Sequence, residues 1–174
     1  MVSGRVWVLR LELHVDVPED GEPQSPVPLS AWEAFARVLE DELSSLCPDT
    51  ARYEAAELSV SLMGPEEIRA VNRDYRERDE ATDVLSFPLW EEEGRFVPEA
   101  MTELLPLGDI LICPEELGRL HGGLSSDEVL CLVLAHGFLH LLAWDHDTEE
   151  REAAMWARQD AIKRRLLNAL REAL

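Results

Sequence analysis

The stretch AHGFLHLLAWDH, residues 135–146, contains three of the five histidines of the chain. His136 and His140 are four residues apart in a run that predicts a helix over about 126–142. Four residues advance an α-helix by about 400° and about 6 Å, so we expect both imidazoles on one face, one turn apart. If the helix then ends, the chain can fold back and bring His146 to the same point. The spacing predicts a three-histidine metal site with an open fourth position, the form typical of catalytic zinc.

A single histidine on an apolar helix is usually a packed core residue, but this clustering at ligand spacing favours a metal site. An all-imidazole ligand set makes zinc the expected ion, one per chain. The spacing also matches the zinc-protease pattern H-E-x-x-H-x-x-G-x-x-H, with two differences. Gly137 stands at the position of the glutamate that acts as general base, and Ala143 at the position of the turn glycine. The missing glutamate argues against ordinary peptide hydrolysis.

The predicted histidine helix is apolar on nearly all sides, which is typical of a central, buried helix. Ser125 or Ser126 is its expected N-cap, followed by acidic residues that suit the helix dipole. Its apolar residues are Val129, Leu130, Leu132, Val133, Leu134, Phe138, Leu139, Leu141 and Leu142.

The rest of the chain predicts an α+β domain built around this helix. Alternating apolar residues predict strands, and capping and periodic patterns predict helices, one of them starting after an N-cap at Ser30. We expect a single domain over residues 1–174, with one mixed sheet of about four strands packed with about five helices. The expected strands are residues 6–17, 55–63, 82–88 and 107–113. The expected helices are residues 31–46, one from 65, a short one from 114, 126–142, and one from about 148 to 170. The expected loops are residues 18–28 and 91–106.

Composition limits the possible partners. The formal net charge of −20 argues against non-specific nucleic-acid binding over the whole surface, so a polyanion must meet a local basic patch. No apolar run is long enough to span a membrane, and no signal-peptide pattern is present, so we expect a cytoplasmic protein that does not bind membranes. Cys47, Cys113 and Cys131 are scattered, which indicates free thiols rather than disulfides.

Three segments, in order, resemble the YbeY family of bacterial rRNA-maturation endoribonucleases. They are the histidine segment at 136–146, the segment from NRDYR at 72–76 to TDVLSFP at 82–88, and LGDI at 107–110. The likeness covers about residues 55–160. The family usually has glycine and tyrosine between the second and third histidines, where this chain has Ala143 and Trp144. If that glycine is needed at positive φ, Ala143 bears strain of about 1 kcal/mol or somewhat more.

The resemblance implies a zinc-dependent, single-strand-specific endoribonuclease that matures the 3′ end of small-subunit rRNA and acts in ribosome quality control. It implies that His136, His140 and His146 bind zinc and that Arg76 is the functionally important arginine. The implied partners are single-stranded ribosomal RNA and small-subunit ribosomal proteins.

Other polar residues near these motifs are candidates for RNA binding or for supporting the ligands: Arg73, Asp83, Asp109 and Asp145. No general base is assigned among the aspartates. For Arg73 a solvated helix face and an RNA contact are equally favoured, whereas Arg69 and Arg78 are interpreted as structural. His14 and His121 have no ligand partner at useful spacing and are interpreted as structural or surface residues.

Two other functions stay open at this point. One is a zinc hydrolase that acts on a different bond, in the manner of a metalloprotease. The other is a non-catalytic ribosome-assembly factor in which zinc has a structural role, so that metal removal would unfold the domain.

Overall fold

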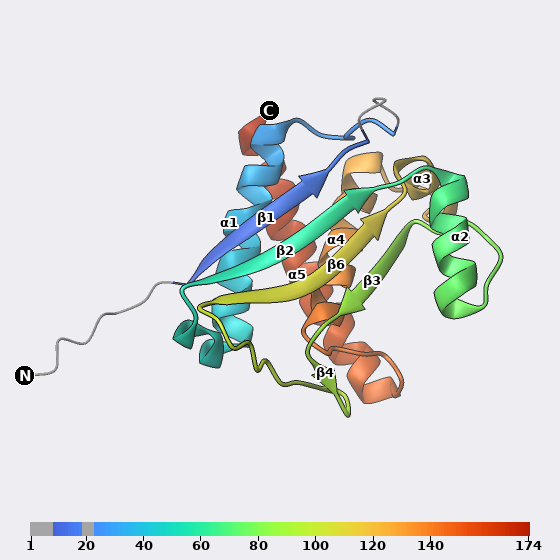
Figure 1. The fold of residues 1–174 in the computed structure, drawn as a ribbon. Helices are drawn as coiled ribbons and strands as arrows, with labels where there is room; N and C mark the ends of the chain where they lie inside the picture. Colours follow the sequence, from blue (N-terminus) through green and yellow to red (C-terminus); the bar gives the residue numbers. More distant parts are fainter. Residues whose placement is uncertain (1–8, 19–22) are drawn as a thin grey trace, which may run out of the picture.

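The centre of the molecule is a four-stranded mixed sheet with the strand order β1-β2-β6-β3 (Figure 1). The computed structural model describes residues 9–18 and 23–174. The three strands β1, β2 and β6 are parallel, and β3 runs antiparallel to β6 at one edge. The strands are β1 (Arg10–Asp16), β2 (Ala55–Leu62), β3 (Val84–Pro88) and β6 (Leu104–Ile112). The predicted α+β class with a four-stranded mixed sheet is confirmed.

Side-chain alternation gives the sheet a buried face and a more polar face. Along β2, Leu58 and Val60 are fully buried, whereas the intervening Ser59 is partly exposed. On the polar face, His14 of β1 lies 3.1 Å from the Glu57 carboxylate of β2. The buried face therefore decides where the helices pack.

Of the five α-helices in the described residues, three lie together on the buried face (Figure 1). There α1 packs on β1, α4 packs on β6 and β3, and α5 packs against both α1 and α4. On the opposite face, Ile68 of α2 joins Leu85 and Leu111 in a smaller apolar cluster. The helices are α1 (Leu29–Leu46), α2 (Pro65–Arg76), α3 (Leu117–Leu120), α4 (Ser126–Leu141) and α5 (Glu149–Ala173). Short 3₁₀ turns occupy Pro48–Arg52 and Pro114–Glu116.

The histidine helix α4 is central, as predicted. Ser125 caps it, accepting a hydrogen bond from the backbone N–H of Glu128, and the Glu128 carboxylate in turn accepts from the Ser125 backbone N–H. Gly137 lies against β6: a Cβ atom there would be 3.1 Å from two carbon atoms of Ile110. The position that carries glutamate in zinc proteases therefore faces the sheet here, with no room for a long side chain.

The start of α1 differs from the sequence-based expectation. Helix α1 begins at Leu29, after Pro28, and Ser30 lies inside its first turn, where its hydroxyl donates to the carbonyl of Ala173 rather than capping the helix. Pro28 is the N-cap residue: its ring fixes φ, observed at −68°, and its ψ of 161° gives the extended backbone typical of an N-cap.

The segment at 91–106 is not a plain loop. It contains the short hairpin of β4 (Glu91–Glu92) and β5 (Arg95–Phe96), and β6 already starts at Leu104. Residues 6–8 of the first predicted strand and 19–22 of the first predicted loop lie outside the described residues.

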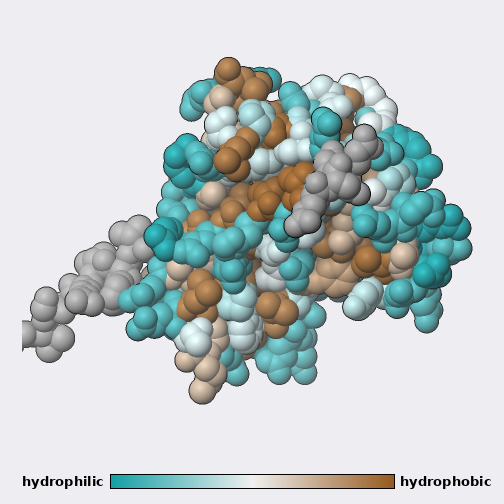
Figure 2. Space-filling view, turned by 45° about the horizontal axis from the view of Figure 1, so that its top comes forward, coloured by the Kyte–Doolittle hydropathy of each residue, from teal (hydrophilic) through white to brown (hydrophobic). Residues whose placement is uncertain are grey.

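On the face shown in Figure 2, hydrophilic residues cover much of the outline, and hydrophobic residues gather in a band across the middle and in smaller patches. Of the helices that the structure describes, none has the length and apolar character needed to cross a membrane. The three cysteines are free thiols, as expected, with Cys113 and Cys131 buried.

Candidate metal centre

The turn after α4 brings the third histidine back to the first two. The backbone N–H of Ala143 donates to the carbonyl of His140, and that of Trp144 to the carbonyl of Leu139, both at 3.0 Å. This pair of bonds is the Schellman motif, which needs a left-handed residue at the first position past the cap. Ala143 fills that position with φ of 61°, although it is not glycine. The chain therefore reverses at once, and His146 returns toward the helix end.

The three imidazoles converge on one point. The ligand nitrogens of His136, His140 and His146 all lie within 4.8 Å of one another. The Nε2 atoms of His136 and His140 are 3.0 Å apart. Tetrahedral zinc with bonds of about 2.0–2.1 Å needs ligand nitrogens about 3.3 Å apart, so small side-chain adjustments would suffice. The residues present therefore fit a three-histidine metal site.

Burial keeps the two helical histidines neutral. Burial is the largest cause that lowers the pKa of His136, and it lowers that of His140 to about 4, helped by its neighbours His136 and His146. A neutral imidazole offers the lone pair that a metal ion requires. At neutral pH, His136 and His140 are therefore in the form that can bind a cation.

His136 has a second polar contact behind the site. Its Nδ1 lies 2.8 Å from Oε1 of Gln159, which comes from α5. The contact spans two helices that are adjacent in the fold and 23 residues apart in sequence. Sequence spacing gave no signal for it.

A cavity of about 220 Å³ opens beside His140. Its walls come from the end of α2 (Arg76), from β3 (Ser86), from the β4–β5 hairpin and from the turn that carries Asp145. Arg76 and Asp145, both predicted as site residues, thus lie beside a predicted ligand. Asp145 also holds the turn, because its carboxylate accepts a hydrogen bond of 2.7 Å from the backbone N–H of His146.

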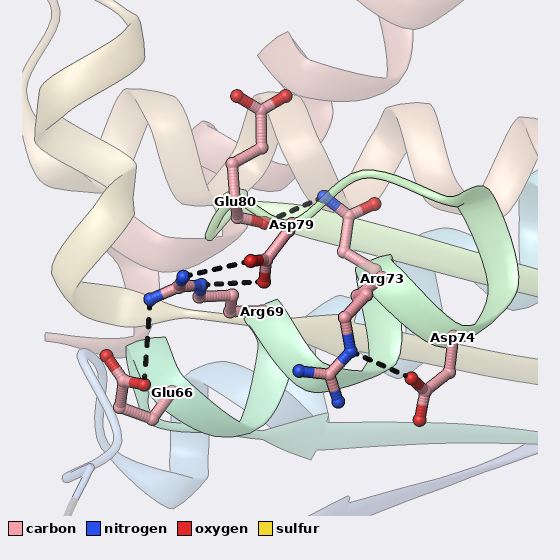
Figure 3. Close-up of polar contacts among 7 residues, drawn as sticks. Glu66, Arg69, Arg73, Asp74, Asp79 and Glu80 are labelled. Carbon is pink, nitrogen blue, oxygen red and sulfur yellow. Dashed lines mark hydrogen bonds and ion pairs between the residues drawn. The ribbon is translucent and has the colours of Figure 1, made fainter.

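The other arginines of α2 are already paired (Figure 3). Arg69 makes two hydrogen bonds to the carboxylate of Asp79, at 2.9 and 3.1 Å, which agrees with the structural role expected for it. Arg73 contacts its neighbour Asp74 at 3.1 Å and is about half exposed. Across residues 9–18 and 23–174, no hydrogen bond or ion pair engages the guanidinium of Arg76. Among these three arginines, Arg76 alone has an unpaired guanidinium in the described part of the chain, whereas Arg73 is paired but keeps about half of its side chain exposed.

The two remaining aspartates lie apart from this cavity. Asp83 is buried and pairs at 2.8 Å with Nε2 of His121, a histidine interpreted from sequence as structural or surface. This pair lines a second hollow, which His136 and Gln159 also border. Asp109 is exposed on β6, next to Ile110, which faces α4. Because neighbouring strand residues alternate, Asp109 points to the opposite face of the sheet, away from the histidines.

Comparison with known proteins agrees with this architecture. The family model for endoribonuclease YbeY matches residues 24–167. Endoribonucleases YbeY from Staphylococcus aureus strains JH9 and Newman are each 38% identical over 133 residues, covering 75% of this chain and 85% of theirs. The solution structure of TM1509 from Thermotoga maritima is similar in fold, with a TM-score of 0.50 and 24% identity, over 94% of this chain and 92% of that one.

Proposed function

The chain belongs to the YbeY endoribonuclease family, and from this premise we propose that it is a zinc-dependent endoribonuclease that cleaves single-stranded RNA. We further propose that its substrate is the 3′ end of small-subunit ribosomal RNA, with a role in ribosome quality control and contacts to small-subunit ribosomal proteins. His136, His140 and His146 are the proposed ligands of one zinc ion per chain.

One observation carries the proposal: an unpaired arginine and a metal-binding cluster meet at the same cavity. Arg76 and His140 line this cavity together. Arg76 is also close enough to His136 that its charge contributes to lowering the pKa of that imidazole, after the larger effect of burial. Arg76 and a metal ion held by the histidines would place two positive charges beside a phosphodiester, which gathers negative charge in its transition state. An amide substrate is neutral before it reacts, so it offers the guanidinium no anionic group to bind in the ground state.

The proposed roles of the residues follow from their chemistry. A zinc ion held by His136, His140 and His146 would supply Lewis acidity, which can lower the pKa of water to about 7 and polarise a phosphoryl oxygen. The planar guanidinium of Arg76 can grip two phosphate oxygens at once and hold the scissile phosphate beside the histidines. Asp145 holds His146 in place through the backbone bond described above. Arg73, about half exposed on the same helix, is a proposed contact for the neighbouring RNA backbone.

The test compares two arginines on α2. Zinc-loaded wild type, Arg76→Ala, Arg76→Lys and Arg69→Ala are assayed for cleavage of a single-stranded RNA that contains the 3′ region of small-subunit rRNA. We expect Arg76→Ala to lower the cleavage rate about 10²–10³-fold with zinc content unchanged, because one charge-stabilising donor is lost. Lysine keeps the charge but not the bidentate geometry, so the cleavage rate of Arg76→Lys should lie between those of wild type and Arg76→Ala.

Arg69→Ala is the matched control, because Arg69 is paired with Asp79. This substitution should change the cleavage rate less than about threefold. Equal activity of Arg76→Ala and wild type would contradict the role of Arg76. Zinc-loaded wild type that leaves RNA intact but cleaves a peptide would overturn the proposed reaction in favour of the metalloprotease-like alternative.

A further inference from the structure

The His136 ring has a polar partner on each of its two nitrogens. Nε2 faces the other ligands, at 3.0 Å from Nε2 of His140, and Nδ1 lies 2.8 Å from Oε1 of Gln159. Gln159 is partly buried on α5, and its neighbour four residues earlier, Met155, is fully buried in the core. The amide therefore projects from a helix that is firmly packed against α4.

The chemistry of an amide oxygen fixes the proton on this ring. A carbonyl oxygen can only accept, so the hydrogen of the Gln159 contact must belong to Nδ1 of His136. A neutral imidazole carries a single N–H, which leaves Nε2 with its lone pair. That lone pair points to the place where the three histidines converge. The opposite tautomer would put a hydrogen on Nε2 and block it as a ligand.

We propose that Gln159 is a positioning residue, which holds His136 in the Nδ1–H tautomer and in the ring orientation that binds a divalent cation through Nε2. The inference rests on the metal centre of the proposed function, but not on RNA cleavage. Partners of this kind behind a metal-bound histidine typically contribute 10–100-fold to metal affinity. The buried site makes the contribution larger than on an open surface, because water can replace the lost acceptor less easily.

Two substitutions separate this role from simple packing. Gln159→Leu removes the acceptor and keeps a side chain of similar size. Gln159→Glu keeps an oxygen acceptor in the same place and cannot donate when ionised. A packing role predicts that leucine is tolerated at least as well as glutamate at this partly buried position. A positioning role predicts the reverse, with glutamate rescuing what leucine loses.

Zinc affinity is measured first, by competition with a chromogenic chelator on metal-free protein. We expect Gln159→Leu to bind zinc about 10–100-fold more weakly and Gln159→Glu within about threefold of wild type or tighter. Gln24→Leu is the matched control, because Gln24 is the other glutamine of the chain and is exposed. It should bind zinc as wild type does. Wild-type affinity in Gln159→Leu, or equal loss in both Gln159 variants, would overturn the proposal.

The tautomer is measured second, from imidazole ¹⁵N chemical shifts of the metal-free protein near neutral pH. Wild type and Gln159→Glu should show His136 with its hydrogen on Nδ1, whereas Gln159→Leu should show a shift toward the Nε2–H form. A wild-type ring protonated on Nε2 would refute the inference whatever the affinities are, and even if the leucine variant failed to fold. Tight zinc binding with the expected tautomer but no RNA cleavage would refute the proposed function alone.

Discussion

At the scale of single residues, Ala143 adopts a backbone conformation that its side chain disfavours. Its φ of 61° is in the left-handed region, which costs a residue with a Cβ about 1–2 kcal/mol. Ala143→Gly removes this cost, but part of the gain in stability is offset because glycine has more conformational freedom in the unfolded chain. We predict that Ala143→Gly raises the free energy of unfolding by about 0.5–1 kcal/mol in urea denaturation.

The same substitution at an ordinary helical position serves as the control. Ala157 is exposed in the middle of α5, and Ala157→Gly should lower the free energy of unfolding by about 1 kcal/mol. Effects of the same sign at both positions would show that Ala143 is not strained.

The metal-free site should make stability depend on pH. Burial lowers the pKa of His140 from 6.5 to about 4 in the folded protein. Between these values the unfolded chain binds the proton and the folded chain does not, so the unfolded state holds more protons. We predict that the free energy of unfolding of zinc-free protein falls as pH decreases from about 6.5 to 4. Denaturation curves at several pH values measure this dependence.

His140→Gln isolates the histidine from the many carboxylates of the chain. The difference in free energy of unfolding between wild type and this variant should shrink or change sign as pH falls from about 6.5 to 4. Parallel pH profiles for the two proteins would mean that His140 is not held neutral by burial.

Some residues of the site could be predicted from the sequence and others could not. The His136–His140–His146 cluster followed from local spacing, because a helical turn and a short reversal are set by neighbouring residues. The His136–Gln159 and Asp83–His121 contacts were not predicted, because each joins segments that are far apart in the sequence. Asp109 was placed near the site by its motif, but strand alternation turns it to the other face.

At the scale of elements, the pairing of β3 with β6 depends on a glycine. Gly108 pairs with Pro88 and has φ of 131°, and a Cβ atom there would lie 2.1 Å from the backbone oxygen of Phe87. Backbone cannot move aside as a flexible side chain can. We predict that Gly108→Ala lowers the free energy of unfolding by about 3 kcal/mol or more, measured in guanidinium chloride. Because β3 also carries Ser86 at the cavity, the variant should bind RNA less well.

Gly118 provides the contrast, because it lies in α3 and a Cβ atom there would meet nothing within 4 Å. Gly118→Ala should be neutral or stabilise the protein by up to about 1 kcal/mol. A Gly108→Ala protein as stable as Gly118→Ala would contradict the close approach of β3 and β6.

Element types were predictable where the hydrophobic period was long and clear, as in α4 and β2. Element boundaries were less predictable. Ser30 and Glu33 have the spacing of a capping box, but the N-cap is Pro28 and α1 begins at Leu29. The hairpin at 91–96 was missed because each of its strands is only two residues long, and both residues of β4 are glutamates. Polar side chains of this kind give no alternating apolar signal.

At the scale of the whole molecule, the fold brings four separate chain segments to one place. The end of α2, the edge strand β3, the β4–β5 hairpin and the turn after α4 all contribute walls to the cavity beside the histidines. The strand order β1-β2-β6-β3 could not be predicted, because it depends on long-range pairing rather than on local pattern. The net charge of −20 repels a polyanion, so the proposed RNA contact depends on the local positive charge of Arg76 and of a cation that the histidines would hold.

Under the proposed function, the three histidines hold a metal ion on a scaffold that is folded without it. The decisive measurement is elemental analysis of wild type and His140→Ala, both purified without added metal, with circular dichroism to follow folding. We predict about one zinc per chain in wild type, little in His140→Ala, and native secondary structure in both, because the core is built by apolar contacts among β2, β6, α1, α4 and α5. Wild type that is metal-free and cannot be loaded with zinc would contradict the metal centre, and a variant that unfolds without zinc would make the ion structural.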